Sequence, residues 1–474
     1  MKKFVFVSLL TLVAMTMSAG EKKEVHILSG NDMHAAIECF PRLGFIADSL
    51  RALYPDLLVL SAGDNRSGDP LNDMFERPAY PMVALMNMVG FHATTLGNHE
   101  FDSGQEGLAR LIGMSDFAYI CANIQPAAKT GIHVRPYQKF DVGGVSLGIV
   151  GAVALGTLGK PESHPDNMTD IEFTDPLETI QKYRFLRDEC DVVVLLSHLG
   201  YEDDVKFSAE LPWVDLIVGG HSHTQLKGGE MHNGLLITQN VNRLQRVTHT
   251  TLVVEDGKVV EKRAENIAVR GEKNVNKVVA QLIEYFNNNP AFGRVLATAD
   301  APFSTYDELG CLMADAFMSE AGTDIAFQNY GGVRYDVKAA GPITVKDVLT
   351  LDPFQNDVVA VSVTGKELAE MLSKCYDNDQ QRFPILAGVT AEYSIDPANR
   401  NLKKMVLYGK DGKKLNLKKT YTVATNSYAL AVSPTNRKDE GHSLGQTTAS
   451  FIMRYLEKLG HVNYQGRTSV KEVR

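Results

Sequence analysis

Polar side chains of metal-ligating type follow five separate apolar runs in the first half of the 474-residue chain. They carry carboxylate, amide or imidazole groups and are Asp32, His34, Asp64, Asn98, His198, His221 and His223. Such donors, without cysteine, suit divalent ions such as Zn, Mn, Co or Fe. One tetrahedral catalytic ion usually takes three protein ligands. The larger set therefore predicts two ions sharing a bridging carboxylate, a centre that can activate water for displacement at phosphorus.

Each of these short motifs has an ordinary explanation when it is taken alone. A Gly-Asp pair is common in turns, and a Ser-His pair more often places a histidine in a core. Their combination is unusual, because five of the 13 histidines follow these runs, whereas the C-terminal segment 294–474 holds only His442 and His461. We therefore interpret the clusters as one site rather than as separate packing features.

The elements that must position these residues are short β-like runs that alternate with helical stretches. The five that precede the polar clusters are Val25–Leu28, Leu57–Leu60, Ala93–Leu96, Val192–Leu196 and Leu216–Val218. Apolar and β-branched runs of this length are typical of strands buried on both faces in α/β layered domains. Ligands of open α/β sheets bind outside the carboxyl ends of the strands. The five clusters are therefore expected to converge at one edge.

Taken in order, the polar clusters resemble the signature of the calcineurin-like metallophosphoesterases. The matching segments are Asp32-x-His34, Gly63-Asp64, Gly97-Asn98-His99-Glu100, Ser197-His198 and Gly220-His221-Ser222-His223. The longer form, which continues to Asp102, is similar to the secreted 5′-nucleotidase and UDP-sugar hydrolase branch. The resemblance implies an N-terminal layered sandwich of β-sheets flanked by helices. One departure is Ala35, where the family usually has glycine.

The resemblance also implies a role for each polar residue. One metal ion would be held by Asp32, His34, Asp64 and His223, and the other by Asp64, Asn98, His198 and His221. His99 would not bind metal. It would stabilise the transition state or the leaving group with the help of Asp102, because an imidazolium held by a carboxylate neutralises developing negative charge.

The second half of the chain carries motifs that would select the substrate. Asn329-Tyr330-Gly331-Gly332-Val333-Arg334 and Pro353-Phe354-Gln355-Asn356 are similar to the 5′-nucleotidase C-terminal domain, an α/β domain. The resemblance implies that Asn329 and Arg334 bind phosphate or nearby polar groups, since an arginine fork matches pairs of oxygens. It also implies that Phe354 and Tyr428 stack on a base, an interaction worth roughly 1–3 kcal/mol per base.

Two departures from this pattern concern the substrate. Cys311 stands where the family helix usually has asparagine. Residues 429–434 replace a Gly-Gly-Asp-Gly loop whose aspartate holds ribose hydroxyls in the family. Ribose recognition would then be weaker, rebuilt by Asp439 or Glu440, or absent.

The expected organisation is a leader followed by two α/β domains with a helix between them. Residues 1–20 have a charged start, an apolar middle and a small-residue end, as in a secretory signal peptide. We expect a metallophosphoesterase domain over 24–265, a linker helix within 266–293 and a 5′-nucleotidase C-terminal domain over 294–474. The mature protein would be exported, either to a periplasm or out of the cell. No later segment predicts a membrane span.

The balance of acidic and basic residues limits the class of partner that the protein can bind. The chain has 48 Lys and Arg against 57 Asp and Glu, a net charge of −9, which argues against a nucleic-acid polymer as partner because that binding depends on basic side chains. We expect a small nucleotide or phosphate ester as substrate and a 5′-nucleotidase that releases nucleoside and phosphate. The alternatives are UDP-sugars, 2′,3′-cyclic nucleotides, 3′-nucleotides, a non-nucleotide phosphate ester, or a binding protein without catalysis.

Overall fold

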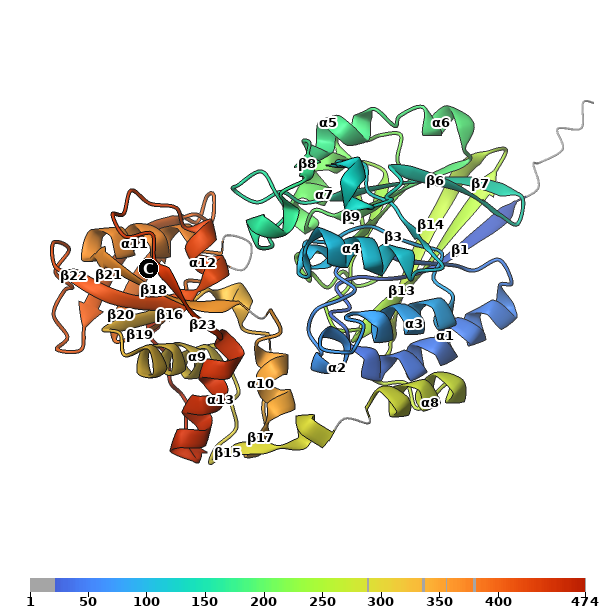
Figure 1. The fold of residues 1–474 in the computed structure, drawn as a ribbon. Helices are drawn as coiled ribbons and strands as arrows, with labels where there is room; N and C mark the ends of the chain where they lie inside the picture. The colour runs from blue at the N-terminus through green and yellow to red at the C-terminus, as the bar shows by residue number, and fades with distance from the viewer. Residues whose placement is uncertain (1–21, 288–289, 335–336, 355, 378–380, 474) are drawn as a thin grey trace, which may run out of the picture.

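The computed structural model describes residues 22–473 except 288–289, 335–336, 355 and 378–380. The expected signal peptide, residues 1–20, lies outside the described residues. The chain forms two lobes, the first built from the blue-to-yellow-green part of the chain and the second from the yellow-to-red part (Figure 1). Each lobe has its own clusters of buried apolar side chains.

The first lobe contains two six-stranded sheets. One has the order β14-β13-β1-β2-β3-β4, with strands Lys258–Ala268, Arg246–Glu255, Lys23–Gly30, Leu58–Ser61, Ala93–Thr94 and Ala118–Tyr119. The other has the order β11-β12-β10-β9-β7-β6, with strands Glu230–His232, Leu235–Thr238, Leu216–Gly219, Val192–His198, Val145–Val153 and Tyr137–Val142. The strands predicted ahead of the polar clusters correspond to β1, β2, β3, β9 and β10.

The two sheets face each other, and helices cover their outer faces (Figure 1). Side chains that include Ile27, Leu60 and Leu196 pack between the sheets, whereas Leu28 and Leu195 point outward, as the two-residue period of a strand requires. The covering helices are α1 (Phe40–Leu53), α3 (Tyr80–Val89), α4 (Gly104–Gly113) and α8 (Lys277–Phe286) on the first sheet, and α5 (Pro176–Gln181), α6 (Leu186–Glu189) and α7 (Tyr201–Ser208) on the second. The layered α/β sandwich predicted from the sequence is therefore confirmed.

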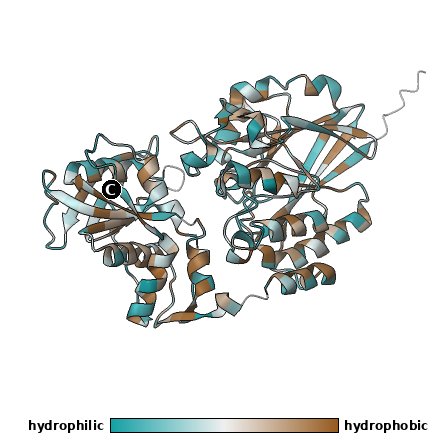
Figure 2. Ribbon diagram, in the orientation of Figure 1, coloured by the Kyte–Doolittle hydropathy of each residue, from teal (hydrophilic) through white to brown (hydrophobic). Residues whose placement is uncertain are grey.

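Helix α8 connects the two lobes but packs on the first. Asn276 caps its first turn by accepting hydrogen bonds from the backbone N–H groups of Val278 and Val279. Val279, Ile283 and Phe286 are buried in the cluster that covers the first sheet. Figure 2 shows hydrophobic and hydrophilic residues alternating along α1, α3 and α8, as expected for helices with one buried face.

The strands that precede the polar clusters run parallel. β1 pairs with β2, β2 with β3, and β9 with β10. Gly30 lies opposite Ser61 in the first sheet, and Gly219 lies opposite Ser197 in the second. Because parallel strands end at the same edge, the loops that carry the polar clusters leave the two sheets at neighbouring positions.

The second lobe is also α/β. Its central sheet has the order β19-β16-β22-β18-β23, with strands Ile385–Ala387, Ile325–Gln328, Thr420–Asn426, Asp357–Thr364 and His442–Thr447. Two smaller sheets are β17-β15-β24 (Gly341–Thr344, Val295–Ala299, His461–Val462) and β21-β20-β25 (Leu402–Gly409, Val389–Ile395, Val470–Glu472). The helices are α9 (Tyr306–Ala321), α10 (Val345–Leu351), α11 (Gly365–Lys374), α12 (Ser427–Val432) and α13 (Thr448–Leu459). None of the helices in the described part of the chain could cross a membrane.

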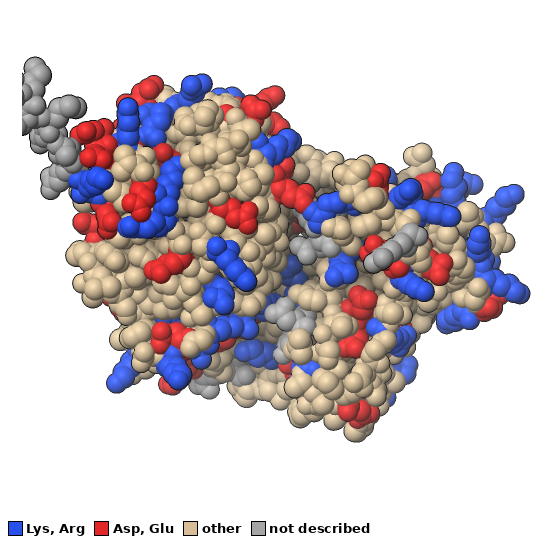
Figure 3. Space-filling view, turned by 180° about the vertical axis from the view of Figure 1, so that it is seen from behind, with Lys and Arg blue, Asp and Glu red and all other residues tan. Residues whose placement is uncertain are grey.

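Basic side chains gather at the outer end of the second lobe, away from the first (Figure 3). Strand β21 lies at the edge of its sheet, and Lys403 and Lys404 on it are exposed. Exposed lysines on an edge strand discourage pairing with another chain. This surface therefore has a structural explanation and lies apart from the site described next.

Candidate metal centre and active site

The first group of polar side chains at the strand ends contains Asp32, His34 and His223. Asp32 Oδ1 lies 3.4 Å from His223 Nε2, and His34 Nε2 lies 3.2 Å from the same atom. One candidate donor atom from each side chain lies within 4.8 Å of the other two. Asp32 and His34 are buried. The segments that carry these residues start after β1 and β10, so strands from both sheets contribute to the group.

A second group lies beside the first, with Asp64 between the two. Asp64 Oδ2 lies 4.0 Å from His34 Nε2 and 3.3 Å from His198 Nε2. Asn98 Oδ1 lies 3.3 Å from His198 Nε2 and 3.1 Å from His221 Nδ1. The structure thus brings all the predicted ligands into one cluster, and Asp64 lies between its two groups.

Most of these residues have an unusual backbone conformation. The φ angles are positive at Asp32 (48°), His34 (43°), Asp64 (50°), His221 (76°) and His223 (55°). Asp and His occupy this left-handed region more readily than β-branched residues do, at a cost of roughly 1–2 kcal/mol per residue. Hydrogen bonds hold two of them in place, because Asp32 N–H donates to Gly63 O and His34 N–H donates to Asp64 O.

Glu100 joins two of the loops that carry the cluster. Its carboxylate is completely buried, and it accepts hydrogen bonds from the backbone N–H groups of Asp64, Asn65 and Gly97. Glycine is required at position 97, since a Cβ there would lie 2.1 Å from Asp64 Oδ1. The sequence places Glu100 in a motif, but only the structure reveals this bracing role.

Charges within the cluster compensate one another. Burial opposes ionisation of Asp64, but His198 and His99 hold the pKa of this carboxyl well below its usual value. Burial likewise opposes protonation of His198, yet Asp64 and Asp32 raise its pKa to about 10. Closely packed carboxylate and imidazole donors, without a cysteine among them, fit a divalent metal centre.

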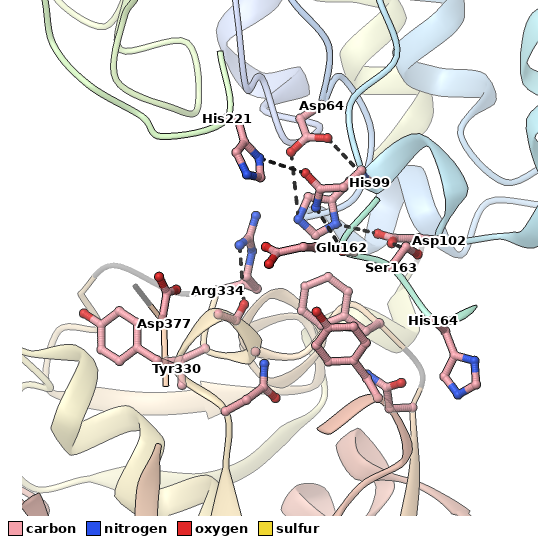
Figure 4. Close-up of a pocket in the computed structure, with 18 of the residues that line it drawn as sticks. Asp64, His99, Asp102, Glu162, Ser163, His164, His221, Tyr330, Arg334 and Asp377 are labelled. Atoms are coloured by element: carbon pink, nitrogen blue, oxygen red, sulfur yellow. Dashed lines mark hydrogen bonds and ion pairs between the residues drawn. The ribbon is translucent and has the colours of Figure 1, made fainter. Parts of the chain in front are cut away.

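His99 and Asp102 form a pair on the open side of the cluster (Figure 4). His99 Nδ1 lies 2.9 Å from Asp102 Oδ2, and Ser163 Oγ donates to Asp102 Oδ1. Burial opposes protonation of His99, but Asp102 and Asp64 outweigh it and raise the pKa of the imidazole. The pair can therefore hold a cationic imidazole beside the metal cluster.

The second lobe reaches the same place through Arg334 and Phe354. Arg334 Nη2 lies 3.0 Å from His34 Nε2. The ring of Phe354 stacks on that of His99, with centroids 5.4 Å apart and planes at 18°. The guanidinium carbon of Arg334 lies 5.6 Å from the centroid of Phe354. The residues predicted to select the substrate thus touch those predicted to perform the chemistry.

Residues of both lobes line one cleft with a volume of about 260 Å³ (Figure 4). The predicted site residues that line it are Asp64, Asn98, His99, Asp102, His221, His223, Asn329, Arg334, Phe354 and Tyr428. Asp32, His34 and His198 are buried beneath it. Asn329 Oδ1 accepts a hydrogen bond from Asn426 Nδ2.

The cleft also contains residues that sequence reasoning missed. They include Glu162, Ser163, His164, Asn167, Asn242, Arg243, Tyr306, Tyr330 and Asp377. The rings of Tyr306 and Tyr330 stack with centroids 5.5 Å apart. The sequence could have indicated Tyr330, because this residue lies inside the Asn-Tyr-Gly-Gly motif. The other residues lie in segments without a motif. In the described part of the chain, Asp377 rather than Asp439 or Glu440 is the second-lobe carboxylate that lines the cleft.

Comparisons with known proteins divide the chain in the same way. The family model for the calcineurin-like phosphoesterases matches residues 26–225, and that for the 5′-nucleotidase C-terminal domain matches residues 290–433. The trifunctional nucleotide phosphoesterase protein YfkN of Bacillus subtilis is 26% identical over 519 residues, which cover 95% of this chain but only 35% of that protein. The 5′-nucleotidase of Vibrio cholerae is 28% identical over 473 residues, which cover 85% of this chain and 82% of that protein.

Among solved structures, the 5′-nucleotidase precursor from Thermus thermophilus has the same fold. Its TM-score is 0.81 at 23% identity, and the match covers 95% of this chain and 100% of that one. The structural match therefore includes both lobes. The metal cluster lies in the part that matches the phosphoesterase family, whose members use divalent metals. The chain belongs to the 5′-nucleotidase family, in which a calcineurin-like phosphoesterase domain precedes a 5′-nucleotidase C-terminal domain, and it is a phosphoester hydrolase.

Proposed function

We propose that the protein is an exported 5′-nucleotidase that uses two divalent metal ions to hydrolyse nucleoside monophosphates to nucleoside and phosphate. The observation that carries the proposal is the meeting of the lobes, where Arg334 contacts His34 and Phe354 stacks on His99. An arginine, a residue type suited to phosphate, and an aromatic ring thus lie beside a cluster suited to divalent metal. The name of the Vibrio cholerae relative supports the same activity.

The proposal assigns the metal ligands as the sequence predicts. They are Asp32, His34, Asp64, Asn98, His198, His221 and His223, with Asp64 shared between two ions, whose identity is Zn, Mn, Co or Fe. When bound, the ions would activate water and neutralise charge on the phosphoryl oxygens. Glu100 would keep Asp64 in position through its backbone hydrogen bonds.

The remaining residues would bind the substrate and handle charge. His99, held by Asp102, would present its protonated imidazole to the oxygens that become more negative during the reaction. Arg334, with Asn329 beside it, would orient the phosphate. Phe354 and Tyr428 would hold the base between aromatic faces.

We also propose the domain division and the export of the protein. The phosphoesterase domain spans 24–265 and the C-terminal domain spans 294–474, a division that the matched segments 26–225 and 290–433 support. Residues 1–20 act as a signal peptide. Expression of the full chain with the first 20 residues present or deleted, followed by cell fractionation, tests export; equal retention in the cytoplasm would contradict it.

A substrate panel on the purified full chain tests the activity. The protein, loaded separately with Mn, Co, Zn or Mg, is given 5′-AMP, 5′-UMP, UDP-glucose, 2′,3′-cyclic AMP, 3′-AMP and glycerol phosphate, and the products are separated by chromatography. We expect kcat/KM to be highest for the 5′-monophosphates and hydrolysis to stop after chelation. A preference for glycerol phosphate would overturn the nucleotide assignment, and no hydrolysis with any metal would favour a binding protein.

A further inference from the structure

Arg243 is a partly buried arginine of the first lobe, and it lies where the two lobes meet. It follows β12 and lines the cleft together with Arg334 of the second lobe. Its backbone N–H donates a hydrogen bond to the carbonyl oxygen of Asp32, at 2.8 Å. The side chain of the preceding residue, Asn242, lies 3.2 Å from the imidazole of His223. The segment that carries Arg243 is therefore attached to two loops of the metal cluster.

The backbone conformation of Arg243 is one that arginine rarely adopts. Its φ angle is 55°, and that of Leu244 is 48°. Such left-handed residues cost roughly 1–2 kcal/mol each, and they are concentrated at binding sites, where the surrounding structure holds them. Because the hydrogen bond to Asp32 helps to fix this conformation, the direction in which Arg243 leaves the backbone is set by the fold and not by a ligand.

The guanidinium of Arg243 contacts backbone groups rather than carboxylates. Its Nη2 donates to the carbonyl oxygen of Arg334. It also lies against the loop after β2, since a Cβ at Gly68 would lie 3.4 Å from the same nitrogen. Within the described residues, neither Glu162 nor Asp377 of the cleft, nor any other carboxylate, forms an ion pair with it. Because a guanidinium carries five N–H donors, most of these donors can bind a ligand in the cleft.

Arg243 and Arg334 place two positive charges side by side. Burial lowers the pKa of the Arg334 guanidinium, and the charge of Arg243 lowers it further. Asp64 and Asp102 act in the opposite direction, but Asp64 lies between histidines and Asp102 holds His99. Like charges that are close together in a partly buried site repel each other unless an anion lies between them. The arrangement therefore favours an anion that both arginines can reach.

The position of the two arginines indicates that this anion is a phosphate group. Arg334 Nη2 lies 3.0 Å from His34 Nε2, so a group at the metal cluster lies within reach of this guanidinium. Figure 4 shows Arg334 between Asp64 and His99 on one side and Tyr330 on the other. The planar fork of an arginine donates parallel hydrogen bonds to two oxygens of a phosphate. The phosphate that reacts at the cluster is therefore also the one that can lie between the arginines.

We propose that Arg243 is a second phosphate-binding arginine, so that one phosphate group is held between guanidinium groups supplied by the two lobes. The sequence motifs assign the phosphate only to Asn329 and Arg334 of the second lobe, and Arg243 lies in no motif. Bound phosphate would replace the repulsion between the arginines by attraction and would draw the lobes together. For the phosphate of a nucleotide the inference rests on the proposed function, whereas for inorganic phosphate it does not.

Calorimetry of the metal-loaded full chain with inorganic phosphate tests the proposal. We expect the dissociation constant to rise roughly tenfold or more in Arg243→Gln, which loses the charge. The rise should be smaller in Arg243→Lys, which keeps the charge but lacks the fork. Arg246→Gln, at an exposed arginine of β13, is the matched control and should bind phosphate as the wild type does. Metal content, measured by mass spectrometry, should be the same in every variant.

Small-angle X-ray scattering separates phosphate binding from a purely structural role, because Arg243 also bonds to the second lobe. We expect Arg243→Gln without phosphate to give the scattering profile of the wild type while its phosphate binding is weakened. A phosphate affinity within about twofold of the wild type would overturn the proposal. Weakened binding that is accompanied by a changed profile in both Arg243 variants would also overturn it, since Arg243 would then only hold the lobes together.

Hydrolysis of 5′-AMP shows whether the same contact serves the substrate. An arginine that binds phosphate equally in the ground and transition states affects KM rather than kcat. We therefore expect KM to rise roughly tenfold in Arg243→Gln, with a smaller change in kcat. An unchanged KM would overturn the assignment to the substrate. No hydrolysis by the wild type, with phosphate binding still weakened in Arg243→Gln, would contradict the proposed function but support the role of Arg243 in phosphate binding.

Discussion

Two carboxylates, Asp102 and Asp64, determine the protonation of His99, because they overcome the effect of burial and raise the pKa of the imidazole. Replacement by alanine removes this cation while leaving the predicted ligands in place. We expect His99→Ala to lower kcat roughly 10²–10⁴-fold, with metal content by mass spectrometry unchanged. His133→Ala, at an exposed histidine of the same lobe, is the control and should match the wild type. Unchanged hydrolysis in His99→Ala would exclude the imidazole from the mechanism.

A second residue-scale prediction concerns Asp352, just before Pro353-Phe354. Burial raises its pKa to about 6, and its Oδ2 has no hydrogen-bond partner in the described chain. Because this folded-state pKa exceeds that of an unfolded aspartate, the native state binds the proton more tightly. The free energy of unfolding therefore falls as the pH rises from about 4 to about 6, by at most ~3 kcal/mol.

Replacing Asp352 with asparagine should remove this pH-dependent fall in the free energy of unfolding. We expect the variant to be more stable than the wild type in urea denaturation at pH 7.5, and the difference to shrink at pH 4. Asp116→Asn, at an exposed aspartate, should leave the free energy of unfolding unchanged at both pH 7.5 and pH 4. A variant that is less stable than the wild type at pH 7.5 would contradict the argument and would indicate that the ionised carboxylate is favoured.

At the scale of elements, the loop after β3 lies against the loop after β2. A Cβ at Gly97 would lie 2.1 Å from Asp64 Oδ1 and 2.6 Å from Asp64 N, so the backbone has to move. We expect Gly97→Ala to lower metal content and to reduce kcat/KM roughly 10²-fold, the effect of a displacement of about 1 Å at a catalytic group. Gly113→Ala, at the end of α4 with no atom within 4 Å, should behave as the wild type. Full activity in Gly97→Ala would show that the two loops can move apart without any loss of kcat/KM.

The elements also show why the sequence predicted one half of the site better than the other. Asp32, Asp64 and His198 could be found because each directly follows an apolar strand, and parallel strands end together. Tyr306 and Asp377 could not, because their positions in the cleft depend on how the second lobe packs against the metal cluster. Residues that meet only through such packing leave no periodic or spaced pattern. The residues on the substrate side of the cleft can therefore be identified only from the structure.

Ribose recognition illustrates the same limit. The sequence lacks the expected aspartate loop and suggested Asp439 or Glu440 as replacements. Asp439, three residues before β23, instead accepts a hydrogen bond from the N–H of Ser362 in β18. Asp377 lines the cleft, but it follows α11 and has no motif around it.

At the scale of the whole molecule, ion pairs connect the two lobes. Lys346 of α10 lies 3.9 Å from Asp69, which caps α2 (Pro70–Asp73), and Arg400 forms an ion pair with Glu202 of α7. Pairs of this kind at a surface contribute roughly 0.2–1 kcal/mol each and are screened by salt. The contact between the lobes is therefore expected to weaken as the ionic strength rises.

Charge reversal tests this dependence. We expect Lys346→Glu to lower the ratio of molecules with the lobes in contact to molecules with the lobes apart by up to about 30-fold, since an attraction of at most about 1 kcal/mol is replaced by a repulsion of similar size. Single-molecule FRET with one dye on each lobe measures the ratio, and added salt should reduce the wild-type value in the same direction. Lys403→Glu, on the exposed edge strand β21, is the control. A ratio that neither the variant nor salt alters would mean that the ion pairs do not hold the lobes.

The positive φ angles at Asp32, His34, Asp64, His221 and His223 have a consequence for protein engineering. The directions of these side chains are set by backbones in the left-handed region, which residues other than glycine rarely adopt. An engineer who copied only the side chains onto another parallel sheet would obtain donors that point away from one another. The transferable unit is instead the set of loops after β1, β2, β3 and β10, together with Glu100, whose carboxylate fixes two of them.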